Sequence, residues 1–568
     1  MKNNFKKRKR SFLKKKKDNF NIDTAFLNTK NISNLDTQKF EGVLEKPLGL
    51  KSFVYFFLVC LLVSLLFISK TFYMQIVKGD EYLKKSIANY HREYVLFSKR
   101  GIIFDRNGKE LVWNEEKENA EFPKRAYIKQ EGFSHLLGFL SYPQKDKSGK
   151  YFEKEYIGKG GIEKYFNQTL NGKLGKIILQ VNSVGEIVSD NVISESEDGQ
   201  NLTLTIDKNI QEQMFQALKT YVQENGFVGG AASIMNVQNG QVLGMVSFPE
   251  YSSEILSEAK DKETIKTYLY DKGKPFLNKA VYGEFTPGSV VKPFIAIAAL
   301  ENDIISPYTK VFTNGKLVIP NKWNPNNPSV FRDWRNQGTV DMFDAIAWSS
   351  NVYFYRIGGG YLNEFKGLGI KLIEENLALF GFGSKTEIEG FAEKKGLLPS
   401  PEWKKKAFKN SPWNVGNTYY TSIGQFGFLT TPMQVLVGIS AIANDGEVLK
   451  PKILLNSEKE VKTVLAYKKK NFDVIKKAMR QTTTSGTTQA LNLDFVQIAS
   501  KSGSAQIKGR TKMNSWVVGF FPYDKPKYAF VFLAENGPKD TKKSVAHAAK
   551  VFFESIYQNE ETKKYFEE

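Results

Sequence analysis

The segment Thr286–Leu300 reads TPGSVVKPFIAIAAL, and the rest of the chain is interpreted around it. Its second half is uncharged and apolar, which predicts a buried helix beginning near Gly288-Ser289. Ser289 and Lys292 are three residues apart, so they share one helical face about one turn apart. The helix N-terminus favours negative charge, and its dipole together with burial is expected to lower the pKa of Lys292. A serine and a neutral amine so placed form a nucleophile with its base. The segment could equally be a buried helix that merely contains a serine and a lysine.

A second motif, Ser349-Ser350-Asn351, lies within the apolar stretch Phe343–Tyr355, which predicts a buried helix and loop. Most such triplets are turns or helix caps, so the motif is weak in isolation. In a catalytic interpretation, the Ser349 hydroxyl bridges Lys292 and a leaving group. The Asn351 amide then offers a donor and an acceptor to the peptide backbone of a substrate.

A third motif, Lys501-Ser502-Gly503, falls in Phe495–Ile507, which predicts a strand. Lys501 and Ser502 could bind a carboxylate, and Gly503 would let a substrate approach the backbone closely. The N–H of Ser504 could be the second oxyanion donor beside that of Ser289. Alone, the segment is better explained as an edge strand weakened by glycine. Together, the three motifs supply a nucleophile, a proton relay and an anion-binding strand, and they predict acyl transfer through a serine ester.

The catalytic part of the chain is expected to be α+β, a sheet with helices packed on it. An Asn-Gly pair between alternating runs predicts a tight hairpin, and late β-branched and aromatic runs predict further strands. The expected strands are Ala231–Met235, Gln241–Ser247, Phe495–Ser500, Trp516–Phe521 and Tyr528–Ala534. The expected helices are Ile210–Leu218, a helix-rich region from Ser289 to about Ala443, and Asp540–Gln558.

An uncharged run near the N-terminus, Ser52–Ser69, approaches the ~20 residues that an α-helix needs to cross a bilayer. The residues after Lys70 offer no cleavage site of a signal peptide, so we predict an uncleaved single-pass anchor. The first 20 residues of the tail at 1–51 hold ten Lys or Arg against one Asp. This cluster favours a cytoplasmic N-terminus, which puts the catalytic part on the periplasmic side of the cytoplasmic membrane. The tail is a solvated arm or contacts anionic lipid, and it lacks the interleaved aromatics of a nucleic-acid module.

Between anchor and catalytic part, residues 70–199 predict an elongated, irregular domain. Phe72–Ala88 predicts a helix beside the membrane, and Tyr94–Val112 predicts two strands around Asn107-Gly108. We expect the boundary with the catalytic domain near Asp198–Gln200, in a polar run. Cys60, the only cysteine, lies in the anchor and the three histidines are scattered, so we expect no disulfide, no metal centre and no cofactor.

The motif set resembles that of class B penicillin-binding proteins, which are peptidoglycan D,D-transpeptidases. Arg100–Gly108 (RGIIFDRNG) resembles the signature of their N-terminal pedestal, and Thr286–Ser289 surrounds the serine as in that family. Further stretches in family order are Gly161–Glu163, Leu170–Gly172, Ser422–Gln425, Thr431-Pro432 and Gly486-Thr487. The resemblance implies a basic tail at 1–51, an anchor at 52–69, a dimerisation-type pedestal at 70–199 and a transpeptidase domain at 200–560. The last would have the serine β-lactamase-like fold, an antiparallel sheet covered by helices.

Within the class, Phe331–Trp334 (FRDW) and Ser422–Gln425 (SIGQ) look most similar to penicillin-binding protein 2, the cell-elongation type. The division-specific type is the close alternative. A class A enzyme would carry a glycosyltransferase domain after the anchor, and residues 70–199 leave too little room for one. The sequence departs from the family pattern in Ser502, where Thr is commoner, and the change keeps the hydroxyl. It also departs in the interval from Trp113 to Ser134, which is too short for the usual head subdomain, so contacts made through the head are not carried over.

The resemblance implies that Ser289, freed of its proton by Lys292, attacks the penultimate D-Ala carbonyl of a stem peptide. An acceptor amine then resolves the ester. Lys501, Ser502 and Ser504 would hold the terminal carboxylate, and β-lactams would acylate the same serine. A membrane glycosyltransferase of the shape, elongation, division and sporulation (SEDS) family is the implied partner, reached through anchor and pedestal. One alternative is a β-lactamase or carboxypeptidase, against which the pedestal argues. Another is a non-catalytic β-lactam-binding scaffold, against which the intact motif set argues.

Overall fold

The computed structural model describes residues 49–116, 118, 120–181, 187–321, 324–362, 364–507, 509 and 511–567. Contacts divide the chain into two compact units, Met1–His91 and Arg92–Glu568. Most of the basic tail predicted at 1–51 lies outside the described residues.

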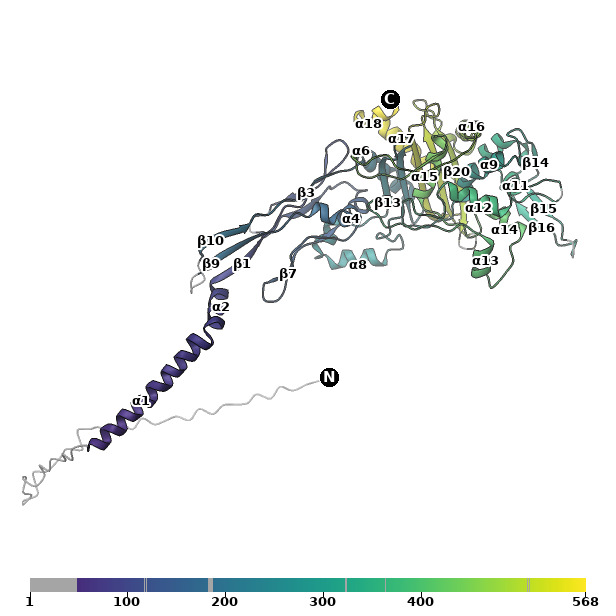
Figure 1. Cartoon of the computed structure of the whole chain (residues 1–568). Coiled ribbons are helices and arrows are strands. Elements are labelled where there is room, and N and C mark those ends of the chain that lie inside the picture. Colours follow the sequence, from purple (N-terminus) through teal and green to yellow (C-terminus); the bar gives the residue numbers. More distant parts are fainter. Residues whose placement is uncertain are drawn as a thin grey trace, which may run out of the picture. The chain divides into compact units, whose positions relative to one another are not determined.

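The described part of the first unit is helical (Figure 1). Helix α1 (Leu50–Phe72) continues through a π-helical turn at Tyr73–Val77, and α2 (Gly79–Tyr90) follows. The segment from α1 through this turn is long and apolar enough to cross a membrane, by length and composition, and it is exposed to its surroundings. The helix predicted at Phe72–Ala88 is divided, because its first residues continue α1 and the chain leaves helical geometry at Lys78.

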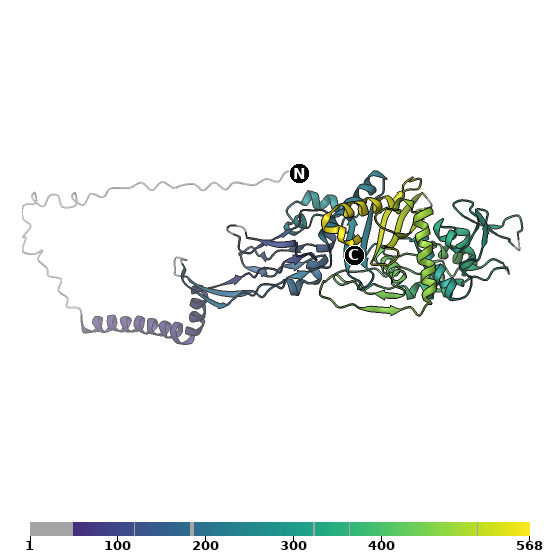
Figure 2. The same cartoon turned by 90° about the horizontal axis from the view of Figure 1, so that it is seen from above.

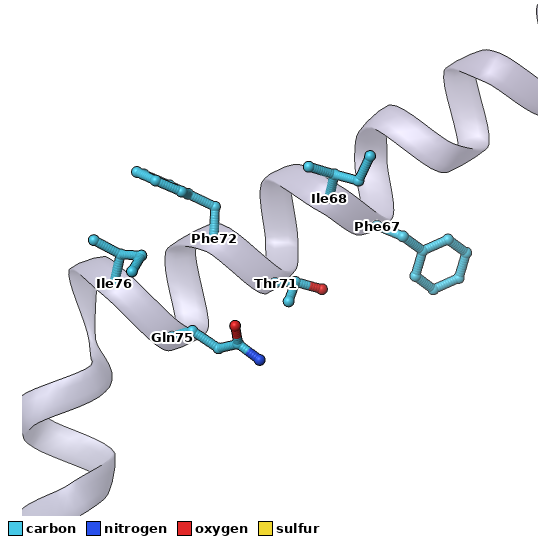
Figure 3. A pocket seen from close by; sticks show the side chains of 6 residues that line it. All are labelled: Phe67, Ile68, Thr71, Phe72, Gln75 and Ile76. Carbon is cyan, nitrogen blue, oxygen red and sulfur yellow. The ribbon is translucent and has the colours of Figure 1, made fainter.

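An open hollow on this helical segment is lined by the side chains that Figure 3 shows. Ile68, Phe72 and Ile76 project to the same side, as a spacing of four residues requires. The full lining is Phe67, Ile68, Thr71, Phe72, Gln75 and Ile76, without an ionisable group. The hollow therefore has the chemistry of a lipid-facing surface rather than that of a reaction site.

The N-terminal part of the second unit contains two small sheets, with strand orders β1-β9-β10 and β11-β2-β3-β4. Their strands are β1 (His91–Leu96), β2 (Ile103–Phe104), β3 (Glu110–Glu115), β4 (Lys124–Tyr127), β9 (Gly175–Val181), β10 (Ile187–Ser194) and β11 (Leu202–Thr203). The turn predicted at Asn107-Gly108 is confirmed, since it joins the antiparallel strands β2 and β3. The Asp105 carboxylate closes this turn by accepting hydrogen bonds from the N–H groups of Asn107 and Lys109, each at 2.8 Å. Strands β3 and β4 pair directly through a short connection.

A buried ionic network stabilises the same part of the chain. The Glu163 carboxylate accepts from Arg100 Nε at 2.6 Å and from Arg125 Nε at 2.7 Å, and all three side chains are fully buried. Arg100 also donates to Asn171. Burial raises the pKa of the Glu163 carboxyl, but the two guanidinium groups outweigh burial and hold that pKa below its usual value. The stretches at 100–108, 161–163 and 170–172, which resemble the pedestal signature, thus meet in one polar core.

The remainder of the second unit is built on an antiparallel sheet with strand order β13-β12-β22-β21-β20. The strands are β12 (Gly229–Asn236), β13 (Val242–Phe248), β20 (Ala499–Ile507), β21 (Lys512–Phe521) and β22 (Tyr528–Pro538). Along β22, Phe530 and Phe532 belong to one hydrophobic core, and Val531 and Leu533 belong to the other. A strand buried on both faces is apolar at successive residues, which explains the composition of β22.

Helices cover both faces of this sheet (Figure 1 and Figure 2). Helices α6 (Lys208–Glu224) and α17 (Ala546–Gln558) pack on one face, and α15 (Pro432–Ala443) and α16 (Lys469–Ser485) pack on the other. The other α-helices in the described part of the chain are α3 (Ser134–Leu137), α4 (Gly161–Tyr165), α5 (Asn167–Leu170), α7 (Ser253–Glu258), α8 (Lys262–Tyr270), α9 (Lys292–Glu301), α10 (Met342–Ala347), α11 (Asn351–Gly359), α12 (Gly369–Leu379), α13 (Pro401–Ala407), α14 (Val415–Ser422) and α18 (Glu560–Glu567).

Small strand pairs complete the described fold. They are β5 (Leu140–Ser141) with β8 (Ile157–Gly158), β6 (Gln144–Lys145) with β7 (Tyr151–Glu153), β14 (Val311–Thr313) with β17 (Gly338–Val340), β15 (Lys316–Ile319) with β16 (Ser329–Arg332), and β18 (Glu447–Leu449) with β19 (Val461–Val464). Two of these pairs, β14–β17 and β15–β16, interrupt the region that was predicted to be rich in helices.

Three boundaries differ from the sequence prediction. The strand predicted from Phe495 begins at Ala499, because its partner β21 ends just before Pro522, which cannot continue the ladder. The helix predicted at Asp540–Gln558 begins at Ala546. The prediction of Ile210–Leu218 covers only the middle of α6, and α18 was not predicted.

Candidate active site

The first motif forms a tight turn that leads into α9. Gly288–Val291 is a single 3-10 turn, and α9 begins at Lys292, so Ser289 precedes the α-helix instead of opening it as predicted. Gly288 has φ +59°, and its N–H donates to the Gly424 carbonyl at 3.0 Å. Residues 292–300 are all buried, which fixes the helix in the core. Pro293 is accommodated in the first turn of α9.

Lys292 connects the first motif to the second. Its fully buried Nζ donates to the Ser349 carbonyl at 2.8 Å, to Ser349 Oγ at 3.2 Å and to Asn351 Oδ1 at 2.8 Å. Burial lowers the pKa of Lys292 to about 7, and the Asp333 carboxylate acts in the opposite direction. The amine is therefore available in both protonation states at neutral pH. Among the described residues the half-buried Ser289 hydroxyl has no hydrogen-bond partner, so it is free to approach a substrate.

The second motif is a short loop between α10 and α11. Ser349 has φ +58°, a left-handed conformation that is uncommon for a residue other than glycine. This conformation directs both the carbonyl and the hydroxyl of Ser349 to Lys292. Ser350 caps α11 by accepting from the Tyr353 N–H at 3.4 Å. The same hydroxyl donates to Asp333 Oδ2 at 2.9 Å.

The third motif lies on the edge strand β20. Lys501 is buried and its Nζ donates to the Ser502 carbonyl at 2.8 Å. Burial holds the pKa of Lys501 well below its usual value, and the nearby Lys292 adds to the effect. Ser502 is half-buried, with its Oγ 2.6 Å from Thr487 Oγ1, and Ser504 is exposed on the same strand.

Gly503 has a packing role in addition to the one expected. A Cβ at this position would lie 2.8 Å from Val290 Cγ1 and 3.0 Å from the Pro287 carbonyl oxygen. Glycine is therefore required so that β20 can pack against the turn that carries Ser289. Close approach of the two protein segments is enough to explain the residue, and the approach of a substrate to the backbone at Gly503 stays a prediction.

Sequence reasoning missed two polar groups of the site, Asp333 and Thr487. Both belong to stretches that had been noted only as similar to the family, Phe331–Trp334 and Gly486-Thr487. Their polar side chains beside glycine or aromatic residues were the available signal. In the described part of the chain, no group of three His, Cys, Asp or Glu side chains could hold a metal ion.

A serine beside a buried amine, with a relay loop and a glycine-containing edge strand, defines a serine acyl-transfer enzyme. Comparison with known families agrees: the penicillin binding protein transpeptidase domain matches residues 230–558, and the penicillin-binding protein dimerisation domain matches residues 119–204. The chain belongs to the penicillin-binding protein transpeptidase family.

Individual relatives point to the elongation type. The peptidoglycan D,D-transpeptidase MrdA of Salmonella typhimurium is 30% identical over 461 residues, which cover 74% of this chain and 70% of the relative. The crystal structure of Pseudomonas aeruginosa PBP2, in complex with WCK 5153, is 27% identical with a TM-score of 0.69, and the match covers 83% of this chain and 98% of that one. PBP2 of Helicobacter pylori, in complex with MreC, is 25% identical with a TM-score of 0.69, and the match covers 82% of this chain and 99% of that one. These findings confirm the resemblance to class B, its elongation type and the predicted fold class.

Proposed function

We propose that this penicillin-binding transpeptidase cross-links peptidoglycan stem peptides during cell-wall elongation, through an acyl-enzyme at Ser289. The observation that carries the proposal is the buried Lys292 amine, whose pKa of about 7 suits a general base and whose contacts join two of the three motifs. β-Lactams present the same acyl and carboxylate groups and acylate the same serine.

Acylation begins when neutral Lys292 takes the proton of the Ser289 hydroxyl. The serine oxygen then bonds to the carbonyl carbon of the penultimate D-Ala, and the N–H groups of Ser289 and Ser504 stabilise the oxyanion. Collapse of this tetrahedral intermediate breaks the peptide bond to the terminal D-Ala. The nitrogen of the departing D-Ala receives the proton from Lys292 through the Ser349 hydroxyl. An acceptor amine attacks the ester next, its proton returns to Ser289 by the same path, and a new peptide bond joins the two strands.

Substrate binding uses the edge strand β20. The hydroxyls of Ser502 and Ser504 hold the terminal carboxylate of the donor peptide. Thr487 Oγ1 forms a hydrogen bond with Ser502 Oγ at 2.6 Å, which orients that hydroxyl. Lys501 is buried and its Nζ donates to the Ser502 carbonyl, so it holds the backbone of β20 beside the two hydroxyls rather than contacting the carboxylate directly. Asn351 shares its amide between Lys292 and the peptide backbone of the substrate.

The apolar helix of the first unit supports a single-pass anchor in the cytoplasmic membrane, with the basic tail inside and the catalytic domain on the periplasmic side. We infer the organisation as tail 1–51, anchor 52–69, pedestal 70–199 and transpeptidase 200–560. The Helicobacter pylori relative was solved with MreC, and a partner of that kind is proposed here too. A SEDS-type glycosyltransferase, reached through anchor and pedestal, is the second proposed partner.

The test is covalent labelling of the full-length chain in detergent with a fluorescent penicillin. Wild-type protein should keep its label for hours, and Ser289→Ala should carry none. Ser11→Ala is a matched control, because Ser11 has the same spacing to a lysine, Lys14, and should label normally. Label on folded Ser289→Ala would refute the nucleophile. Rapid loss of label from the wild type would indicate a β-lactamase or carboxypeptidase, and no label on folded wild type would indicate a scaffold.

A further inference from the structure

A carboxylate outside the three motifs contacts the loop Ser349–Asn351, which holds the proposed proton relay. Asp333 follows strand β16, and its Oδ2 accepts the Ser350 hydroxyl at 2.9 Å and the Val352 N–H at 3.0 Å. Its Oδ1 accepts the N–H of Trp334 at 2.9 Å. One side chain therefore ties the segment after β16 to the first turn of α11, directly after Ser349.

The residues after Asp333 hold the other side of the same loop. Trp334 Nε1 donates to the Trp348 carbonyl at 3.1 Å, and Gln337 Nε2 donates to the same oxygen at 3.4 Å. The Arg335 guanidinium lies over the rings of Trp334 and Trp348, 4.5 Å and 5.2 Å from their centroids. The segment 333–337 thus contacts Trp348 before Ser349, and the N-cap Ser350 and Val352 after it.

This support matters because of the backbone conformation that it surrounds. The left-handed Ser349 is held at a cost of about 1 kcal/mol or more, and relaxation of the loop would withdraw its carbonyl and hydroxyl from Lys292. Among the described residues, Asp333 and Lys501 are the ionisable side chains that interact electrostatically with the Lys292 amine, one an acid and the other a base. The Asp333 carboxylate favours the ammonium form, whereas burial disfavours it.

We propose that Asp333 is a positioning residue for acyl transfer, which fixes the Ser349–Asn351 loop on Lys292 and supplies the negative charge facing that amine. The proposal rests on the proposed function, since it concerns how the base of that reaction is held. Asp333 acts through Ser350, Val352 and Lys292 and does not touch the substrate.

The experiment measures the second-order rate constant of acylation by a fluorescent penicillin against pH, on the full-length chain. Asp333→Asn keeps the size and one acceptor oxygen but removes the charge. The acid limb of its profile should shift to lower pH, because Lys292 loses the group that favours its protonated form. The plateau should fall about tenfold, since a neutral acceptor holds the loop less firmly than a carboxylate.

Asp341→Asn is the matched control. Asp341 caps α10 by accepting from the Asp344 N–H, asparagine caps as well, and the change removes one negative charge from the same region without touching the loop. The acid limb and the plateau of its pH profile should equal those of the wild type. An unshifted limb in Asp333→Asn would overturn the proposal, even with a lower plateau, because a purely structural role would lower the plateau alone.

Asp333→Glu tests the same idea if the asparagine variant does not fold. Its carboxylate is one methylene further out, so the limb should stay near that of the wild type while the plateau falls. A wild-type plateau would overturn the positioning role. Failure of the proposed function is recognised separately, because the wild-type protein itself would then form no stable acyl-enzyme.

Discussion

The rate at which Ser289 is acylated should rise with pH through the deprotonation of Lys292. Burial lowers the pKa of this amine from 10.5 to about 7, and the Asp333 carboxylate opposes part of the effect. Only the neutral amine can accept the serine proton, so the usable fraction is about one tenth at one unit below the pKa and about nine tenths at one unit above it. The second-order acylation constant should therefore increase about tenfold from pH 6 to pH 8 and then level off. An ordinary lysine would leave the constant still climbing about tenfold per unit at pH 9.

Stopped-flow fluorescence with a labelled penicillin, on the full-length chain between about pH 5.5 and 9.5, measures this profile. Lys292→Met should reduce acylation by about 10²- to 10⁴-fold, the usual contribution of a general base. Lys279→Met is the matched control, because Lys279 is also fully buried but donates to the Gly273 carbonyl at 2.6 Å and lies 3.6 Å from Glu535. Its acid limb should stay where the wild type has it. A constant that is flat over this range, or a limb that survives in Lys292→Met, would refute the reasoning.

Three further predictions concern packing and stability. Gly503→Ala would bring a Cβ to 2.8 Å from Val290 Cγ1 and displace the turn that carries Ser289, so labelling by penicillin should slow by about 10- to 100-fold while the fold survives in circular dichroism. Glu163→Gln leaves two buried arginines without their carboxylate and should lower the free energy of unfolding by about 3–5 kcal/mol, measured by urea denaturation; a loss under 1 kcal/mol would contradict the role of the network. Tyr565→Phe removes the hydrogen bond from the Tyr565 hydroxyl to Asp207 Oδ2 at 2.8 Å and should lower the free energy of unfolding by about 1–3 kcal/mol. Faster proteolysis of α18 is the local readout, and unchanged proteolysis would contradict the prediction.

The sequence was most informative where a pattern depends on neighbouring residues. The Asn-Gly turns, the alternating strands and the uncharged N-terminal run each describe a local preference, and the structure contains the hairpin β12–β13, strand β22 and helix α1 at those places. Strand β22 is continuously apolar instead, because its successive side chains point to opposite faces and each face packs on its own core. The start of β20 was not predictable in this way, because it depends on where the partner strand β21 ends.

The site was predicted as a set of residues but not as a set of contacts. Spacing alone suggested that Lys292 faces Ser289, whereas in the structure its hydrogen bonds go to Ser349 and Asn351. Those bonds depend on the left-handed conformation of Ser349, which no residue preference indicates, since serine rarely adopts it. Asp333 was likewise invisible as part of the site, because its contact with Ser350 joins segments separated by strand β17 and helix α10.

The number of protons on Lys292 supports the proposed role of Ser349 as the proton relay. An ammonium group has three donors, and the Ser349 carbonyl, the Ser349 hydroxyl and Asn351 Oδ1 accept all of them. A neutral amine has two donors and a lone pair, so deprotonation must release one of the three acceptors. The hydroxyl has the longest contact, 3.2 Å, and it alone of the three can also donate a hydrogen bond. Deprotonation can therefore reverse this bond without moving the loop, so that the Ser349 hydroxyl points its proton at the amine, and reprotonation of Lys292 turns that proton outward again. A hydroxyl that changes direction with each proton transfer is what a leaving group needs beside it, and neither a carbonyl nor an amide oxygen at the same place could do it.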